Sequence, residues 1–195
     1  MPSDKFKEKN KQKLVEDVEE GLETAPLTID QNVKTGKVIA RHYEILEAIG
    51  QGGMSTVYKA RHTILNKVVA IKFILPRLVH DQNSILRFKK EAQAATELQH
   101  PNICSVKEFG VDEEGSPYIV MDYVEGKSLR EEVDESGPLL AERALHLFKQ
   151  ICTGVQHAHS RGVIHRDIKP DNIVLVKEKD GQDGVRIVDF GIAKL

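Results

Sequence analysis

The sequence predicts an α+β fold in which a sheet-rich first part is followed by a helical second part. Short runs of β-branched and aromatic residues recur between turn residues over positions 42–123, which is typical of antiparallel strands. Segment 139–160 instead has apolar residues at helical spacing. A hydrophobic fraction of 40% in 195 residues is enough for one sizeable core.

Residues 1–37 are expected to form a polar tail outside this fold. Lysines alternate with other residues over positions 5–13, and four acidic residues follow over positions 16–20. Apolar side chains are sparse in this segment, so it buries too little surface to order itself.

The sheet-rich part contains five expected strands and one helix. The strands are expected at 42–49, 55–61, 67–74, 103–109 and 118–123, with a turn at 112–115. The helix is expected to begin at Ser84 as its N-cap and to end before Pro101. Its apolar positions recur at three- to four-residue spacing: Phe88, Ala92, Ala95 and Leu98.

The second part begins with the helix at 139–160, and Gly162 stands where a helix C-cap belongs. A hairpin of strands 173–176 and 185–188 follows, joined by a turn rich in Asp-Gly steps. Only a few residues follow the hairpin, so we expect one apolar face of the long helix to remain uncovered.

Composition excludes several classes of function. The chain has 28 basic and 30 acidic residues, a net charge of −2, which offers no electrostatic footprint for nucleic acid. No stretch without a charged side chain exceeds 11 residues, whereas a membrane helix needs about 18. The first residues have no apolar core of a secretory signal. Two cysteines, Cys104 and Cys152, form no disulfide framework, so we expect a cytoplasmic protein.

A glycine-rich segment, 50–53, lies between two expected strands. Glycines let a backbone close over phosphates and direct N–H groups at their oxygens, although a glycine-rich hairpin is often only a turn. A dinucleotide-binding fingerprint would need a strand–helix context and a glycine at Ser55, and a Walker loop would need Gly-Lys-Ser/Thr. Neither of these nucleotide-binding motifs is present.

Three further segments carry polar residues of matching chemistry. Lys72 lies in an apolar strand, where it either points to solvent or holds anionic phosphates. In the loop 165–172, Asp167 could take a hydroxyl proton, Lys169 could offset phosphate charge and Asn172 could bind Mg²⁺. Asp189 ends the hairpin opposite Asn172, and few protein oxygens suffice for Mg²⁺.

In this order the segments 50–57, 69–72, 165–172 and 189–191 resemble the motifs of the protein kinase family. The resemblance implies that Glu91, on the first helix, pairs with Lys72. The sequence around Lys169 is similar to that of serine/threonine kinases. Segments 52–60 and 87–92 are similar to those of bacterial eukaryotic-like kinases. It implies a kinase fold with a five-stranded N-lobe and hinge over 38–124 and an incomplete helical C-lobe over 125–195.

The resemblance also implies the substrates and the site. ATP, Mg²⁺ and the Ser/Thr hydroxyls of proteins are expected, with Asp167 and Lys169 as catalytic residues and with Asn172 and Asp189 on magnesium. Met121 is expected as the gatekeeper, and residues 122–124 are expected as the hinge whose backbone meets adenine. The expected ATP-binding residues are Ile49, Gly50, Gln51, Gly52, Gly53, Met54, Ser55, Thr56, Val57, Ala70, Lys72, Glu91, Met121, Asp122, Val124 and Val174.

Two departures from the family pattern leave an alternative open. Ser55 replaces the third glycine of the loop, and the resemblance ends four residues after Gly191, before an activation loop. The chain could therefore be an ATP-binding fragment or pseudokinase that transfers no phosphate. A small-molecule kinase shares part of the pattern, but Lys169-Pro170 argues against it. A membrane anchor beyond residue 195 also stays open.

Overall fold

The computed structural model describes residues 35–53, 55–74, 82–113, 115–178 and 180–190. They belong to one compact unit that spans Lys34–Leu195. The expected tail lies outside the described residues up to position 34, and so does Met54 of the glycine-rich segment.

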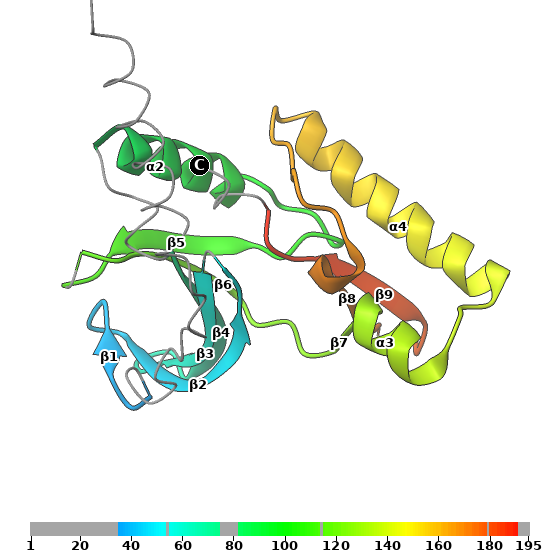
Figure 1. The fold of residues 1–195 in the computed structure, drawn as a ribbon, viewed down its shortest axis with the longest axis horizontal. Helices are drawn as coiled ribbons and strands as arrows, with labels where there is room; N and C mark the ends of the chain where they lie inside the picture. The colour runs from blue at the N-terminus through cyan, green and yellow to red at the C-terminus, as the bar shows by residue number, and fades with distance from the viewer. Residues whose placement is uncertain (1–34, 54, 75–81, 114, 179, 191–195) are drawn as a thin grey trace, which may run out of the picture. The chain divides into compact units, whose positions relative to one another are not determined.

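A six-stranded antiparallel sheet forms the first part of this unit (Figure 1). Its strands are β1 (Val38–Ile39), β2 (Tyr43–Gln51), β3 (Ser55–His62), β4 (Lys67–Ile74), β5 (Val106–Val111) and β6 (Pro117–Asp122). They are arranged in the order β1-β2-β3-β4-β6-β5. Five strands were expected, and β1 is the addition.

The expected start of the fourth strand at Ile103 is wrong. Strand β5 begins at Val106, and Ile103 forms an isolated parallel bridge with Ile187. Because Ile103 is apolar and buried, its pattern looks like that of a strand, although its backbone pairs with a distant hairpin. This bridge links the two parts of the unit.

Helix α2 (Gln82–Thr96) covers one face of the sheet and contacts β5. Phe88, Ala92 and Ala95 are buried in a core cluster with residues of β4 and β6. The described helix already includes Ser84, so the expected N-cap at this residue is wrong. Apolar periodicity fixes the face of a helix better than its first turn.

The second part contains η2 (Pro170–Asn172) and a three-stranded sheet of β7 (Lys127–Ser128), β8 (Ile173–Lys177) and β9 (Asp183–Ile187). It also contains helices α3 (Leu129–Ser136) and α4 (Ala141–His159). The hairpin and the long helix confirm the expectation, whereas α3 and β7 were not expected. A sequence signal for α3 exists, because Ser128 and Glu131 form a capping box.

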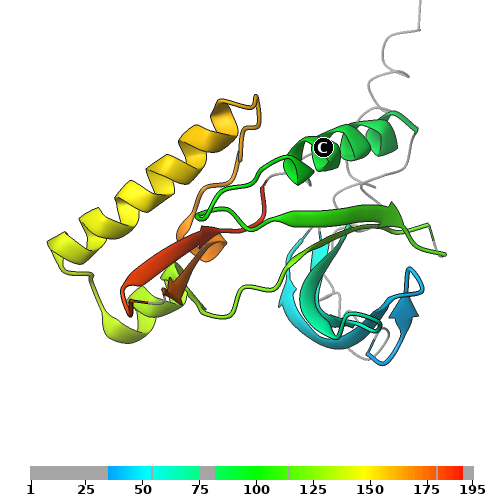
Figure 2. The same cartoon turned by 180° about the vertical axis from the view of Figure 1, so that it is seen from behind.

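Helix α4 lies beside β9 in both views (Figures 1 and 2). Leu147 and Ala158 are buried against the hairpin, in a core cluster that includes Ile187. Leu140 and Phe148, both apolar residues of segment 139–160, are 80% and 62% exposed, so part of its apolar stripe is uncovered, as expected. None of the helices among the described residues combines the length and the apolar character that crossing a membrane requires.

Candidate active site

His165 anchors the loop that carries the expected catalytic residues. Its ring is 2% exposed and packs edge-on against Phe190, with 4.6 Å between ring centroids. Nδ1 accepts a hydrogen bond from the Asp167 N–H, and Nε2 lies 2.9 Å from the Val188 carbonyl oxygen. Since Nδ1 accepts, Nε2 carries the proton. Burial lowers the pKa of His165, which favours this neutral form.

Asp167 is held by its neighbours in the same loop. Lys169 Nζ lies 3.1 Å from Asp167 Oδ2. Asn172 Nδ2 donates to the Asp167 carbonyl oxygen at 2.9 Å and to Oδ2 at 3.2 Å. The hydrogen bond to Asp167 raises the pKa of Lys169, so this side chain stays cationic beside the carboxylate. The loop thus places a hydrogen-bonded carboxylate next to a positive charge.

Asn172 and Asp189 meet because antiparallel pairing brings the start of β8 and the end of β9 together. The Val188 N–H donates to the Asn172 carbonyl oxygen at 3.0 Å. The Asn172 amide nitrogen is engaged by Asp167, so its side-chain oxygen is the atom suited to a cation. Asp189 has φ +62°, a left-handed conformation that costs a non-glycine residue about 1 kcal/mol or more. The surrounding contacts hold it there.

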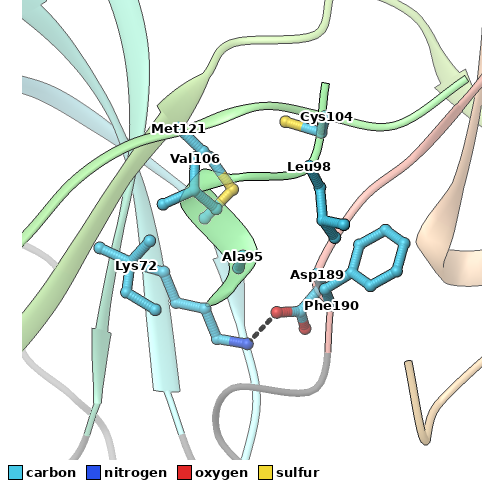
Figure 3. A pocket seen from close by; sticks show the side chains of 9 residues that line it. Lys72, Ala95, Leu98, Cys104, Val106, Met121, Asp189 and Phe190 are labelled. Carbon is cyan, nitrogen blue, oxygen red and sulfur yellow. Dashed lines mark hydrogen bonds and ion pairs between the residues drawn. The ribbon is translucent and has the colours of Figure 1, made fainter. Parts of the chain in front are cut away.

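Lys72 reaches this carboxylate from the sheet. It is 5% exposed on β4, and its Nζ forms an ion pair with Asp189 Oδ1 (Figure 3). In the same view the Phe190 ring turns away from Lys72. An apolar strand therefore delivers one buried cation to the end of the hairpin, and the sequence alternative in which Lys72 points to solvent is wrong.

The expected pairing of Glu91 with Lys72 is not the one observed. Glu91 Oε1 accepts from Arg166 Nη1 at 2.7 Å, while Lys72 pairs with Asp189. A partly buried carboxylate needs a cationic partner, and the loop arginine satisfies it here. Arg166 also has a left-handed φ of +63°, like Asp189.

A cavity of about 580 Å³ opens between the sheet and the hairpin. Most of the expected site residues line it: Ile49, Gly50, Gln51, Gly52, Ser55, Val57, Ala70, Lys72, Met121, Asp122, Val124, Lys169, Asn172, Val174 and Asp189. The cavity thus has apolar walls near Ala70 and Val174, with charged and amide groups at one end.

Four of the expected residues that the structure describes do not line this cavity. Thr56 is 6% exposed, because alternation along β3 turns it to the face opposite Ser55 and Val57. Glu91 and Asp167 do not line the cavity. Glu91 contacts Arg166, and Asp167 contacts Lys169, which does line the cavity. Gly53 is exposed. Met54 lies outside the described residues.

Four lining residues were missed in the sequence: Cys104, Gly126, Asp171 and Val188. Tyr123, which also lines the cavity, lies within the hinge 122–124 that the resemblance implies. Cys104 is buried, its thiol donates to the Asp122 carbonyl oxygen at 3.2 Å, and burial raises its pKa to about 12. Gly126 stands where a Cβ would lie 2.0 Å from the Leu175 carbonyl oxygen. Val188 and Asp171 each adjoin an expected metal ligand, which was a usable signal.

Comparison with known proteins places these features in a family. A protein kinase domain model matches residues 43–195. The chain is 40% identical over 168 residues to the serine/threonine-protein kinase pkn3 of Myxococcus xanthus, covering 86% of this chain and 31% of that protein. It is 44% identical over 158 residues to serine/threonine-protein kinase PrkC of Bacillus subtilis, covering 81% of this chain and 24% of that protein. The chain therefore spans under a third of these relatives.

Solved structures show the same fold. The kinase domain of Mycobacterium tuberculosis PknI superposes with a TM-score of 0.71 at 30% identity, over 82% of this chain and 63% of that chain. Rad53, solved in complex with AMP-PNP, superposes with a TM-score of 0.68 at 32% identity, over 80% of this chain and 40% of that chain. These matches agree with the α+β fold expected from the sequence. The chain belongs to the protein kinase family.

Proposed function

We propose that this chain carries the ATP site and catalytic loop of a serine/threonine protein kinase, which transfers the γ-phosphate of ATP to Ser and Thr hydroxyls of proteins. The observation that carries the proposal is the convergence of Lys72, Asn172 and Asp189 on one cavity. The Asp167–Lys169 pair lies next to that convergence. Relatives that are named as serine/threonine kinases support the same assignment.

ATP fits the chemistry of the cavity. A volume of about 580 Å³ is in the range of about 300–1,000 Å³ typical of small-molecule sites. We assign the adenine to the space between Ala70 and Val174, beside Met121, and the phosphates to the end with Lys72. The glycine-rich segment 50–53 then covers the phosphates with its backbone N–H groups.

Asn172 and Asp189 supply the hard oxygen donors that Mg²⁺ prefers. Magnesium bound there with ATP would neutralise negative charge on the phosphates. Lys72 is a protein cation at this end of the cavity, able to contact either phosphate or the Asp189 carboxylate.

The transfer step uses the catalytic loop. The acceptor hydroxyl oxygen forms a bond to the γ-phosphorus while the bond from that phosphorus to the β,γ-bridging oxygen breaks, and ADP leaves. Asp167 orients the hydroxyl and takes its proton. Lys169, 3.1 Å from Asp167, stabilises charge on the transferring group.

Phosphate transfer from labelled ATP to casein tests this proposal. Replacing Asp167 with Asn should lower the transfer rate by about 10²–10⁴-fold, because the carboxylate that accepts the proton is lost. Asp134→Asn is the matched control, since Asp134 is exposed on α3. Equal rates for the wild type and Asp167→Asn would contradict the proposed role.

The same assay addresses the alternative that the chain binds ATP without transferring phosphate. The names of the relatives do not favour it. Wild-type protein that binds Mg²⁺-ATP but leaves casein unlabelled would overturn the transfer proposal and retain the binding site. We further propose a cytoplasmic location, which agrees with the free thiols of Cys104 and Cys152.

A further inference from the structure

Asn102 lies outside the cavity, in the segment that leads from α2 to β5, yet it contacts both α4 and β9. Its side chain is buried, with 8% of the residue exposed. Nδ2 donates to Gln150 Oε1 at 3.0 Å and to the Val185 carbonyl oxygen at 3.1 Å. Oδ1 accepts from Thr153 Oγ1 at 3.2 Å. Both ends of the amide are engaged, so its orientation is fixed.

The backbone around Asn102 holds the end of β9. The Ile187 N–H donates to the Asn102 carbonyl oxygen at 2.8 Å, and the Cys104 N–H donates to the Ile187 carbonyl oxygen at 2.9 Å. Segment 102–104 therefore pairs with β9 immediately before Val188 and Asp189. We call these two hydrogen bonds to Ile187 the clamp. Only Val188 separates Ile187 from Asp189.

Helix α4 completes the clamp through Gln150. Its Oε1 accepts from the Val185 N–H at 3.0 Å, and its Nε2 donates to the Asp183 carbonyl oxygen at 2.9 Å. Gly154, one turn further along α4, allows the close approach, because a Cβ there would lie 2.9 Å from Ile187 Cδ1. The same strand is thus held by α4 on one side and by segment 102–104 on another.

We propose that Asn102 is a positioning residue for Asp189, which it holds in the conformation that binds magnesium by fixing β9 against α4. The inference rests on the proposed function, which assigns Asp189 to the metal. Asp189 needs such support because its left-handed backbone is unfavourable unless neighbouring contacts impose it. A buried amide with three side-chain hydrogen bonds supplies a rigid attachment.

Asn102→Asp tests the proposal in the chain of residues 1–195. The substitution keeps the shape of the side chain but puts an acceptor where the Val185 carbonyl needs a donor. We expect the Mg²⁺ concentration at half-maximal ATP binding to rise about tenfold, as for other residues that orient metal ligands. Adenosine affinity should stay unchanged, and amide hydrogen exchange at 188–190 should become faster.

Two further variants keep the test decisive. Asn66→Asp makes the same chemical change in an exposed turn. It should change neither the Mg²⁺ midpoint nor the hydrogen exchange at 188–190. Thr153→Val removes only the bond to Asn102 Oδ1 and the bond of the same hydroxyl to the Gln150 carbonyl. Thr153→Val should raise the Mg²⁺ midpoint by a smaller factor than Asn102→Asp does. If Asn102→Asp does not fold, an unchanged midpoint in Thr153→Val overturns the proposal and a raised midpoint supports it.

A purely structural role would give a different result. A lower melting temperature with an unchanged Mg²⁺ midpoint and unchanged exchange at 188–190 would overturn the proposal. Wild-type protein that binds no nucleotide would instead overturn the proposed function. Amide hydrogen exchange at 188–190 would still test the positioning role in that case: faster exchange in Asn102→Asp would support it, and unchanged exchange would overturn it.

Discussion

At the residue scale, the charges of the candidate site are paired across elements that are distant in sequence. Lys72 on β4 pairs with Asp189 after β9, and Glu91 on α2 pairs with Arg166 in the loop 165–172. Removing one partner of a buried or half-buried pair leaves the other without compensation. Each charge variant must therefore be compared with a charge variant elsewhere.

Lys72→Met should weaken ATP binding strongly while retaining the fold, because Met matches the apolar stem of lysine and lacks its charge. We expect the Kd for Mg²⁺-ATP to rise by about tenfold or more, the loss of one charge-assisted contact of about 1.5–3 kcal/mol. Lys149→Met is the control, since Lys149 is exposed on α4 and does not line the cavity. Equal Kd values for both variants would contradict the placement of the phosphates beside Lys72.

His165 makes the stability of the fold sensitive to acid. Burial lowers the pKa of His165 below the usual 6.5. The ring therefore takes up a proton less readily in the folded state than in the unfolded state. The stability gained this way is complete above pH 6.5 and is lost as the pH falls through the folded pKa. His100 and His157 have lowered pKa values for the same principal reason, their burial.

Melting temperatures between pH 7.5 and pH 5 measure this effect. We expect the wild type to lose stability below pH 6.5 and His165→Gln, whose side chain can still donate to the Val188 carbonyl, to lose less over the same interval. His159→Gln, at an exposed position of α4, is the control. A pH profile of His165→Gln parallel to that of the wild type would count against a neutral buried His165.

At the element scale, the connection from β6 to β7 depends on a close backbone approach. Gly126→Ala would put a Cβ 2.0 Å from the Leu175 carbonyl oxygen of β8, so backbone must shift. Overpacking of this kind costs about 1–3 kcal/mol, and Gly126 also lines the cavity. Urea unfolding should show this loss together with weaker ATP binding. At Gly53 an added Cβ meets nothing within 4 Å, so Gly53→Ala should unfold like the wild type.

Helix α4 offers two adjacent positions that differ in burial. Leu147 is 2% exposed and Phe148 is 62% exposed. Leu147→Ala should lower the free energy of unfolding by about 2–5 kcal/mol through the loss of buried contacts. Phe148→Ala should change it by less than about 0.5 kcal/mol, as for surface substitutions. Similar urea midpoints for the two variants would contradict the packing of α4 against β9.

At the scale of the whole molecule, strands and helices with clear apolar periodicity could be predicted, and those held by other interactions could not. The strands β2, β3, β4 and β6, the hairpin and α4 follow from their patterns of apolar residues. The short strands β1 and β7 have too few residues for a pattern. Helix α3 buries no residue, so only its capping box could indicate it.

The candidate site divides in the same way. Motif spacing predicted Lys72, Asn172 and Asp189, because each stands at a fixed place in a strand or loop. The pairing of Glu91 with Arg166 could not be predicted, since it depends on how α2 lies against the loop 165–172. The contribution of Cys104 and Gly126 to the cavity follows from tertiary contacts, and no local motif contains them.

We propose that one cavity of this protein binds ATP through Mg²⁺ held by Asn172 and Asp189. Calorimetric titration of residues 1–195 with ATP, with and without Mg²⁺, tests it most directly. We predict saturable binding of one ATP per chain that requires Mg²⁺ and is weakened at least about tenfold by Asp189→Asn. Binding that is equally tight without Mg²⁺ or in Asp189→Asn, or no binding by the folded wild type, would contradict the claim.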